Sequence, residues 1–217
     1  MLQQIAARMA RLHGAISHQR LGGLRSGAGS LFGDTVSDDS EHWVFGYGSL
    51  MWRPGFPYLE RAAATLHGRR RAFCIYSVHH RGTPARKGLV LGLAPGGSVR
   101  GAAYRVADAD WPVTYAYLMD REQPTETYVE ARVQVRLADG RRTEALTFLS
   151  DKAHPQWAGP LSLERQTELI AGATGLSGRN VDYLADLVGH LADEGIHDRT
   201  METLLGMVRA REARLPA

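Results

Sequence analysis

The sequence predicts an α+β domain whose sheet is antiparallel or barrel-like. Residues 43–149 hold short apolar runs broken by glycine and proline, which is typical of strands. Residues 161–214 hold apolar side chains at helical spacing instead. Strands followed by helices, without regular βαβ alternation, favour this class over a doubly wound parallel sheet. The chain has 217 residues, 44% of them hydrophobic, which is enough for a sizeable core.

Five apolar runs predict strands in the first half of the domain, at residues 43–47, 62–66, 71–78, 89–94 and 99–106. The first of these ends in a turn at Gly48 and Ser49. The last two flank Pro95-Gly-Gly-Ser98, a composition typical of a tight chain reversal. We therefore expect a β-hairpin with its turn at residues 95–98.

The apolar period then changes to that of a helix. Asp108 can cap a helix that carries Pro112 in its first turn and runs to about Arg121. A second hairpin is predicted from residues 128–137 and 142–149, joined through Ala138-Asp-Gly140. Alternation along its first arm places five apolar residues on one face: Val129, Ala131, Val133, Val135 and Leu137.

The last third of the chain predicts three amphipathic helices, at residues 161–171, 180–194 and 200–214. Gly195 is typical of the residue that ends a helix, and Asp198 is typical of the cap that begins the next one. No internal repeat is present.

Residues 1–42 are predicted to form an N-terminal extension, with a short amphipathic helix at 2–17 and a flexible Gly/Ser-rich linker, while residues 43–217 form the main domain. Residues 1–33 are rich in arginine and free of acidic residues, a composition that resembles an organelle transit peptide, but they lack the apolar core of a secretory signal. Four of the 26 basic residues lie in residues 1–33, which contain no acidic residue, so the remainder is close to neutral. The net charge of +3 therefore gives no support to nucleic-acid binding.

Other classes of protein and site lose support from the composition. No apolar run reaches the length of a membrane-spanning helix, so we expect no membrane partner. Cys74 is the single cysteine and lies in an apolar run, which predicts a small buried hydrophobe in a reducing, cytoplasmic environment. His79 and His80 are adjacent, so on an extended segment their side chains point to opposite faces, and we expect no metal site there.

Two features can carry chemistry. The turn Tyr47-Gly48-Ser49-Leu50 can expose successive backbone N–H groups, which bind an anion without a cationic side chain, and Arg53 can add charge nearby. Glu122 follows the predicted helix at a junction with a strand, where a cleft can desolvate a carboxylate and raise its pKa toward neutrality. A plain turn and a solvated carboxylate remain the alternatives at this point.

A longer pattern of residues resembles the ChaC-like γ-glutamylcyclotransferases. It starts with Val44-Phe-Gly-Tyr-Gly-Ser-Leu-Met-Trp-Arg-Pro-Gly-Phe56 and includes Arg121-Glu122 followed by Tyr128. The other matching segments occur in the same order, at residues 64–68, 82–84, 88–93, 96–98, 101–106, 154–160, 175–178, 182–184 and 195–198. The resemblance covers about 160 residues of the sequence, from Trp43 to beyond Leu204.

This resemblance implies a γ-glutamylcyclotransferase-like fold, a small, mostly antiparallel β-barrel with surrounding helices. It also implies cleavage of glutathione to 5-oxoproline and cysteinylglycine, with no metal and no cofactor. Glu122 matches the catalytic general acid/base, and Tyr47, Gly48, Ser49 and Leu50 match the substrate-binding loop. Tyr128 would bind the glutamyl end of the substrate or orient Glu122, and Arg53 and Trp157 are weaker candidates for the pocket.

Two alternatives stay open. The enzyme could act on other γ-glutamyl amines or amino acids, or the domain could bind a γ-glutamyl ligand without turning it over. The presence of Glu122 argues against the second alternative, because loss of that carboxylate would be the simplest sign of a non-catalytic relative. The sequence assigns no oligomeric state.

Overall fold

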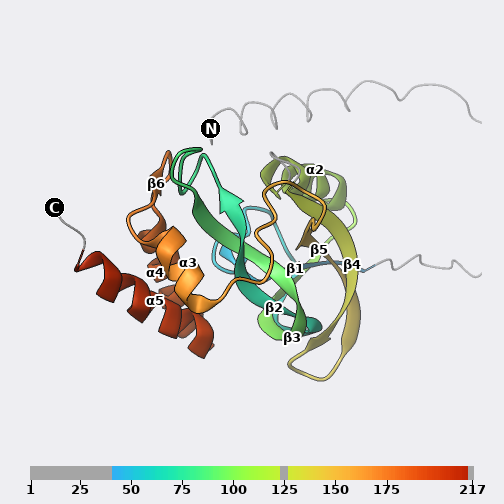
Figure 1. Cartoon of the computed structure of the whole chain (residues 1–217). Helices are drawn as coiled ribbons and strands as arrows, with labels where there is room; N and C mark the ends of the chain where they lie inside the picture. Colours follow the sequence, from blue (N-terminus) through green and yellow to red (C-terminus); the bar gives the residue numbers. More distant parts are fainter. Residues whose placement is uncertain (1–40, 123–126, 215–217) are drawn as a thin grey trace, which may run out of the picture. The chain divides into compact units, whose positions relative to one another are not determined.

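A computed structural model describes residues 41–122 and 127–214 of the chain. Five strands form a closed barrel in the order β1-β3-β2-β4-β5 (Figure 1). Strand β1 pairs in parallel with β5, and every other pair in the barrel is antiparallel. The strands are β1 (His42–Gly46), β2 (Glu60–Ser77), β3 (Gly88–Val106), β4 (Tyr128–Leu137) and β5 (Arg142–Ser150). The α+β, mostly antiparallel barrel is therefore confirmed; the helix expected at residues 2–17 lies outside the described residues.

The hairpin expected at Pro95–Ser98 is wrong. Residues 88–106 form one strand, β3, and both of its halves pair with β2, which is also continuous where two strand pieces were expected. The glycines are bulge positions instead of a chain reversal, since the register shifts between His67 and Arg69. Gly68, Gly96 and Gly97 all have positive φ there, a conformation that side chains disfavour. Pairing with the long strand β2 therefore makes this segment a bend in a two-stranded ribbon, although its sequence resembles a turn.

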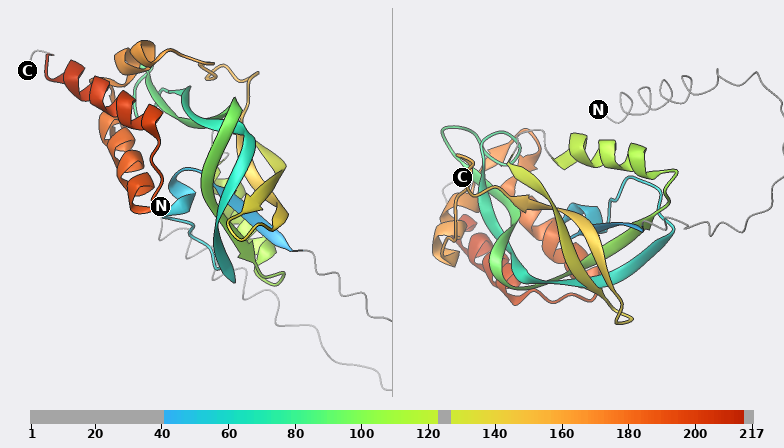
Figure 2. Two further views of the ribbon diagram at one scale, coloured as in Figure 1. Left: turned by 90° about the horizontal axis from the view of Figure 1, so that it is seen from below. Right: turned by 90° about the vertical axis from the view of Figure 1, so that its right-hand side faces the viewer.

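Strands β2 and β3 run side by side in Figure 2, and the bend divides this ribbon into two successive parts. The part with residues 60–67 and 98–106 belongs to the barrel, where it pairs with β1 and β4. The part with residues 69–77 and 88–95 continues beyond it, and an isolated bridge joins Ile75 to Trp157. The candidate site lies along this second part.

Helices surround the strands. They are η1 (Ser49–Met51), α2 (Trp111–Glu122), α3 (Leu163–Ile170), α4 (Asn180–Asp193) and α5 (Arg199–Glu212), and a two-stranded sheet of β6 (Thr174–Gly175) and β7 (Gly178–Arg179) precedes α4. Helices α3, α4 and α5 gather together, apart from α2 (Figures 1 and 2). The predicted helix ends are confirmed, because Gly195 has φ +65° after α4 and the Asp198 side chain accepts a hydrogen bond from the Met201 N–H.

The barrel core explains why α2 keeps its place. Trp43, Phe45, Tyr104 and Phe148 are buried inside, and Leu118 of α2 is buried against this cluster. Burial of one such leucine contributes about 2 kcal/mol.

The predicted hairpin of β4 and β5 is also confirmed, with Gly140 at its turn. The apolar face of β4 is buried only toward Val135 and Leu137, whereas Val129 is 43% exposed. Among the described residues, no helix is long and apolar enough to cross a membrane.

Candidate active site

Glu122 is the last residue of α2, and its side chain is 20% exposed. Burial raises the pKa of this carboxyl group above its ordinary value. The Arg121 guanidinium opposes that shift, since its Nε lies 3.0 Å from Glu122 Oε1. Desolvation is the larger effect, so Glu122 takes up a proton more readily than a solvated glutamate.

The segment Tyr47–Leu50 leaves the barrel at the end of β1 and enters η1. A Cβ atom at Gly46 would lie 2.8 Å from the Leu50 Cβ, so the tight return of the chain requires glycine at that position. Within the described residues, the amide groups of Gly48, Ser49 and Leu50 donate no hydrogen bond. Three consecutive N–H groups are thus available to an anion.

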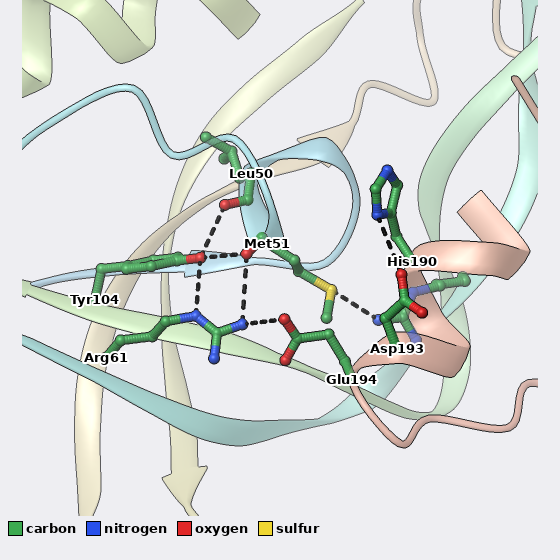
Figure 3. A network of polar contacts seen from close by, with 8 residues as sticks. Leu50, Met51, Arg61, Tyr104, His190, Asp193 and Glu194 are labelled. Carbon is green, nitrogen blue, oxygen red and sulfur yellow. Dashed lines mark hydrogen bonds and ion pairs between the residues drawn. The ribbon is translucent and has the colours of Figure 1, made fainter. Parts of the chain in front are cut away.

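The carbonyl groups of the same segment are held by the barrel. The Tyr104 hydroxyl lies 3.0 Å from the Leu50 carbonyl oxygen and 2.7 Å from that of Met51 (Figure 3). Arg61 contacts the Tyr104 hydroxyl and the Met51 carbonyl, and it pairs with Glu194 at the end of α4 (Figure 3). Buried Arg71 donates to the Tyr47 carbonyl at 2.7 Å. Because the Tyr47, Leu50 and Met51 carbonyls are held by these side chains, the backbone that carries the three amides is pre-organised.

Arg121 joins this loop to Glu122. Its Nη2 lies 2.9 Å from Ser49 Oγ, and its Nη1 donates to the Arg53 carbonyl at 2.5 Å. Nη1 also lies 2.8 Å from the Tyr117 hydroxyl, one turn earlier on α2. One guanidinium therefore fixes the relative position of the carboxylate and the binding loop.

Two cavities meet at Glu122. The larger has a volume of about 320 Å³ and the smaller about 50 Å³, and both are lined by Ser49, Glu122, Tyr128 and Tyr183. The smaller one is also lined by Tyr47, Gly48 and Leu50, so the structure brings the predicted loop, Glu122 and Tyr128 to one place. A volume of about 300 Å³ suits a small-molecule ligand.

Tyr128 and Arg53 differ in their relation to these cavities. The Tyr128 hydroxyl donates to the Leu91 carbonyl of β3 at 2.7 Å, and burial raises the pKa of Tyr128 well above its ordinary value. Tyr128 is therefore a neutral hydrogen-bonding group in the cavity wall. The Arg53 side chain is exposed and lines neither cavity; its carbonyl oxygen, by contrast, is tied to Arg121. Trp157 also lines neither cavity and pairs with Ile75.

The sequence also drew attention to one cysteine and to two adjacent histidines. Cys74 is buried as predicted, and burial raises the pKa of its thiol to about 11. His79 and His80 follow β2 in a loop and line the larger cavity.

The sequence model of the family described as "ChaC-like protein" matches residues 42–211, which is most of the chain. The chain belongs to the ChaC-like protein family. The resemblance inferred from its motifs is therefore confirmed.

Individual relatives of this ChaC-like chain carry related names. It is 35% identical over 198 residues to the glutathione-specific γ-glutamylcyclotransferase of Escherichia coli, covering 90% of this chain and 86% of that protein. It is 31% identical to the human glutathione-specific γ-glutamylcyclotransferase 1, covering 69% of each chain. A crystal structure of a yeast γ-glutamyl cyclotransferase specific to glutathione superposes with a TM-score of 0.74 and 25% identity, over 82% of this chain and all of that one. The ChaC-like chain therefore has the γ-glutamyl cyclotransferase fold.

Three residues of the ChaC-like site had no role assigned from the sequence. Arg121 was part of a matching motif, but its bridge to Ser49 spans 72 positions of the chain. Tyr183 comes from α4 and lies in the matching segment 182–184, to which no role was assigned. Arg81 lies in the loop after β2 and lines the larger cavity. Membership of matching segments was the signal for Arg121 and Tyr183, whereas no motif of the sequence included Arg81.

Proposed function

We propose that this protein cleaves glutathione to 5-oxoproline and cysteinylglycine as a γ-glutamylcyclotransferase. The observation that supports this most directly is the position of Glu122, a carboxylate with a raised pKa, in a cavity shared with the three available amides of Gly48, Ser49 and Leu50. The names of the bacterial and human relatives favour glutathione as the substrate. We assign the catalytic domain to residues 43–217 and the reaction to the cytoplasm, the reducing compartment expected from the single buried thiol.

The reaction requires a base because the α-amine of the substrate is mostly ammonium near neutral pH. Glu122 removes a proton from it, and the nitrogen attacks the γ-carbonyl carbon to form the five-membered lactam. The bond from that carbon to the cysteinyl nitrogen breaks, and Glu122 returns its proton to that nitrogen. The ring nitrogen gives up a second proton, so it ends as the N–H of the lactam and the released amine ends as ammonium. Atoms balance without water, since the amine of the substrate replaces the amine that leaves.

The binding loop lowers the barrier in two ways. Its amide groups bind the α-carboxylate or the oxyanion that develops on the γ-carbonyl. Ring closure is intramolecular, so the site accelerates it by holding the glutamyl chain folded, with nitrogen ~3 to 3.5 Å from the carbonyl carbon. Tyr128 hydrogen-bonds the glutamyl end or orients Glu122. We assign Arg53 no contact with the substrate, because its exposed side chain lines neither cavity.

Release of 5-oxoproline from purified protein tests the proposal. Reduced glutathione and γ-glutamylalanine are supplied in parallel, and product is measured over time. Release from glutathione, with little from the dipeptide, is the expected result. Release from γ-glutamylalanine alone would transfer the activity to other γ-glutamyl compounds, and no release from either would favour a binding module.

A further inference from the structure

The larger cavity extends beyond the groups that a γ-glutamyl moiety needs. From Glu122 and Tyr128 it continues along β2 to the loop that follows this strand, where His79, His80 and Arg81 line it. Tyr183 lines both cavities together with Glu122, and its ring also contacts the Arg81 guanidinium. A ligand that fills this space has a part that reaches Arg81.

The loop carrying Arg81 is held in place by its surroundings. The Leu176 and Ser177 N–H groups donate to the His79 and His80 carbonyls at 2.8 and 2.9 Å. The Arg81 N–H donates to Ser77 Oγ at 2.9 Å. Any Cβ at Gly82 would collide with the backbone of Ser77 and Gly88, so the chain passes there in close contact with itself. The backbone that presents Arg81 is thus fixed before a ligand arrives.

The Arg81 guanidinium is positioned but not neutralised. It lies over the Tyr183 ring, with Cζ 5.1 Å from the ring centroid, and Nη1 donates to the Arg179 carbonyl at 3.3 Å. No carboxylate in residues 41–122 or 127–214 forms an ion pair with it. Arg121, the other guanidinium lining this cavity, is already paired with Glu122. Arg81 retains donors suited to bidentate binding of a carboxylate.

We propose that Arg81 binds the C-terminal carboxylate of a tripeptide substrate and selects against γ-glutamyl compounds that lack it. This inference rests on the proposed function and adds a specificity-determining residue to it. The amine end of the substrate lies at Glu122 and the glycine carboxylate at Arg81, so the opposite ends of the peptide meet groups of opposite charge. The aromatic face of Tyr183 keeps the guanidinium in a fixed plane.

The test compares glutathione with its glycinamide, in which the terminal carboxylate is replaced by a carboxamide. Binding is measured by calorimetry, and turnover by 5-oxoproline release. The wild-type protein should favour glutathione by about 10- to 100-fold, the range for a hydrogen-bonded charge. In R81Q this preference should fall to nearly one, through loss of affinity for glutathione alone, and R81K should lie between. A wild-type protein that binds both ligands equally would overturn the inference.

R179Q is the matched control, because the Arg179 side chain pairs with Asp182 and Glu212 and does not line the cavity. It should keep the full preference for glutathione. Equal losses for both ligands in R81Q would show that Arg81 has only a structural role. Selective binding without any turnover would sustain the inference about Arg81 and reject the proposed reaction. Turnover of both compounds without selectivity would sustain the reaction and reject the inference about Arg81.

Discussion

The Arg121 Nε lies 3.0 Å from Oε1 of Glu122, the next residue in the sequence and the last residue of α2. The same guanidinium reaches Ser49 of the binding loop at 2.9 Å. It therefore lowers the pKa of the carboxyl group while it holds the loop beside it. Chemistry and geometry at this site depend on one cation, and separate measurements can distinguish the two effects.

R121Q should move the acidic limb of the kcat/KM profile to higher pH. Glu122 must be ionised to accept a proton, and loss of the guanidinium removes the influence that lowers its pKa, leaving desolvation unopposed. The loss of activity should therefore be larger at pH 6 than at pH 8. R165Q, which removes a surface arginine paired with Glu168, is the control and should leave the profile unchanged. A uniform loss at every pH would assign Arg121 to loop positioning alone.

E122Q should abolish 5-oxoproline release while substrate binding stays detectable, because the amide keeps the shape of the side chain and lacks the base. Near-normal turnover would remove Glu122 from the mechanism.

E122Q should also change the pH dependence of stability. A carboxyl whose pKa is raised by folding destabilises the folded state as pH rises through that pKa. The Tm of E122Q relative to wild type should thus increase from pH 4 to pH 8; a constant difference would contradict the raised pKa.

Y104F should raise KM more than it lowers kcat. The Tyr104 hydroxyl contacts the Leu50 and Met51 carbonyls, so its loss loosens the loop that presents the amides without touching Glu122. The free energy of unfolding should fall by about 1–3 kcal/mol, since buried carbonyls lose a partner. Steady-state kinetics and chemical denaturation measure both effects. Y58F is the control, because Tyr58 is 45% exposed and packs edge-on against Tyr104.

Y128F should reduce kcat/KM about tenfold and leave the acidic limb of its pH profile near its wild-type position. The hydroxyl donates to the Leu91 carbonyl, so its removal frees a wall of the cavity to move, at a cost of ~1 kcal/mol in hydrogen bonding. A large displacement of the acidic limb would show instead that Tyr128 acts chiefly by tuning the pKa of Glu122. Activity in the pH range 5 to 9 distinguishes these outcomes.

The local structure was largely predictable where local chemistry decides it. The cap at Asp198 and the stop at Gly195 are satisfied by atoms within a few residues, so their sequence signals were correct. Pro95-Gly-Gly-Ser98 was misjudged because the same glycines suit a turn and a bulge. Pairing with residues almost 30 positions earlier, on β2, decided between them.

The site was predictable in its components but not in its assembly. Glu122 and the segment Tyr47–Leu50 could be named because a family pattern carries them. The side chain of Arg53 could not be placed, because proximity in sequence to the loop does not determine the direction of an exposed side chain. Tyr183 reaches the site from a helix more than 130 residues after the loop, and helical periodicity does not predict such a contact.

The sequence by itself determined the class of fold, the family, and the strand and helix segments outside the β2–β3 ribbon, because periodicity, capping and motifs are properties of short stretches of chain. Tertiary structure alone decided that Arg121 connects Glu122 with Ser49 and that Arg81, which forms no ion pair with any described residue, lines the same cavity. The physical reason is closure of the barrel. Pairing of β1 with β3 and β5 brings distant segments within hydrogen-bond range, and burial there changes the pKa of groups that would be ordinary in water.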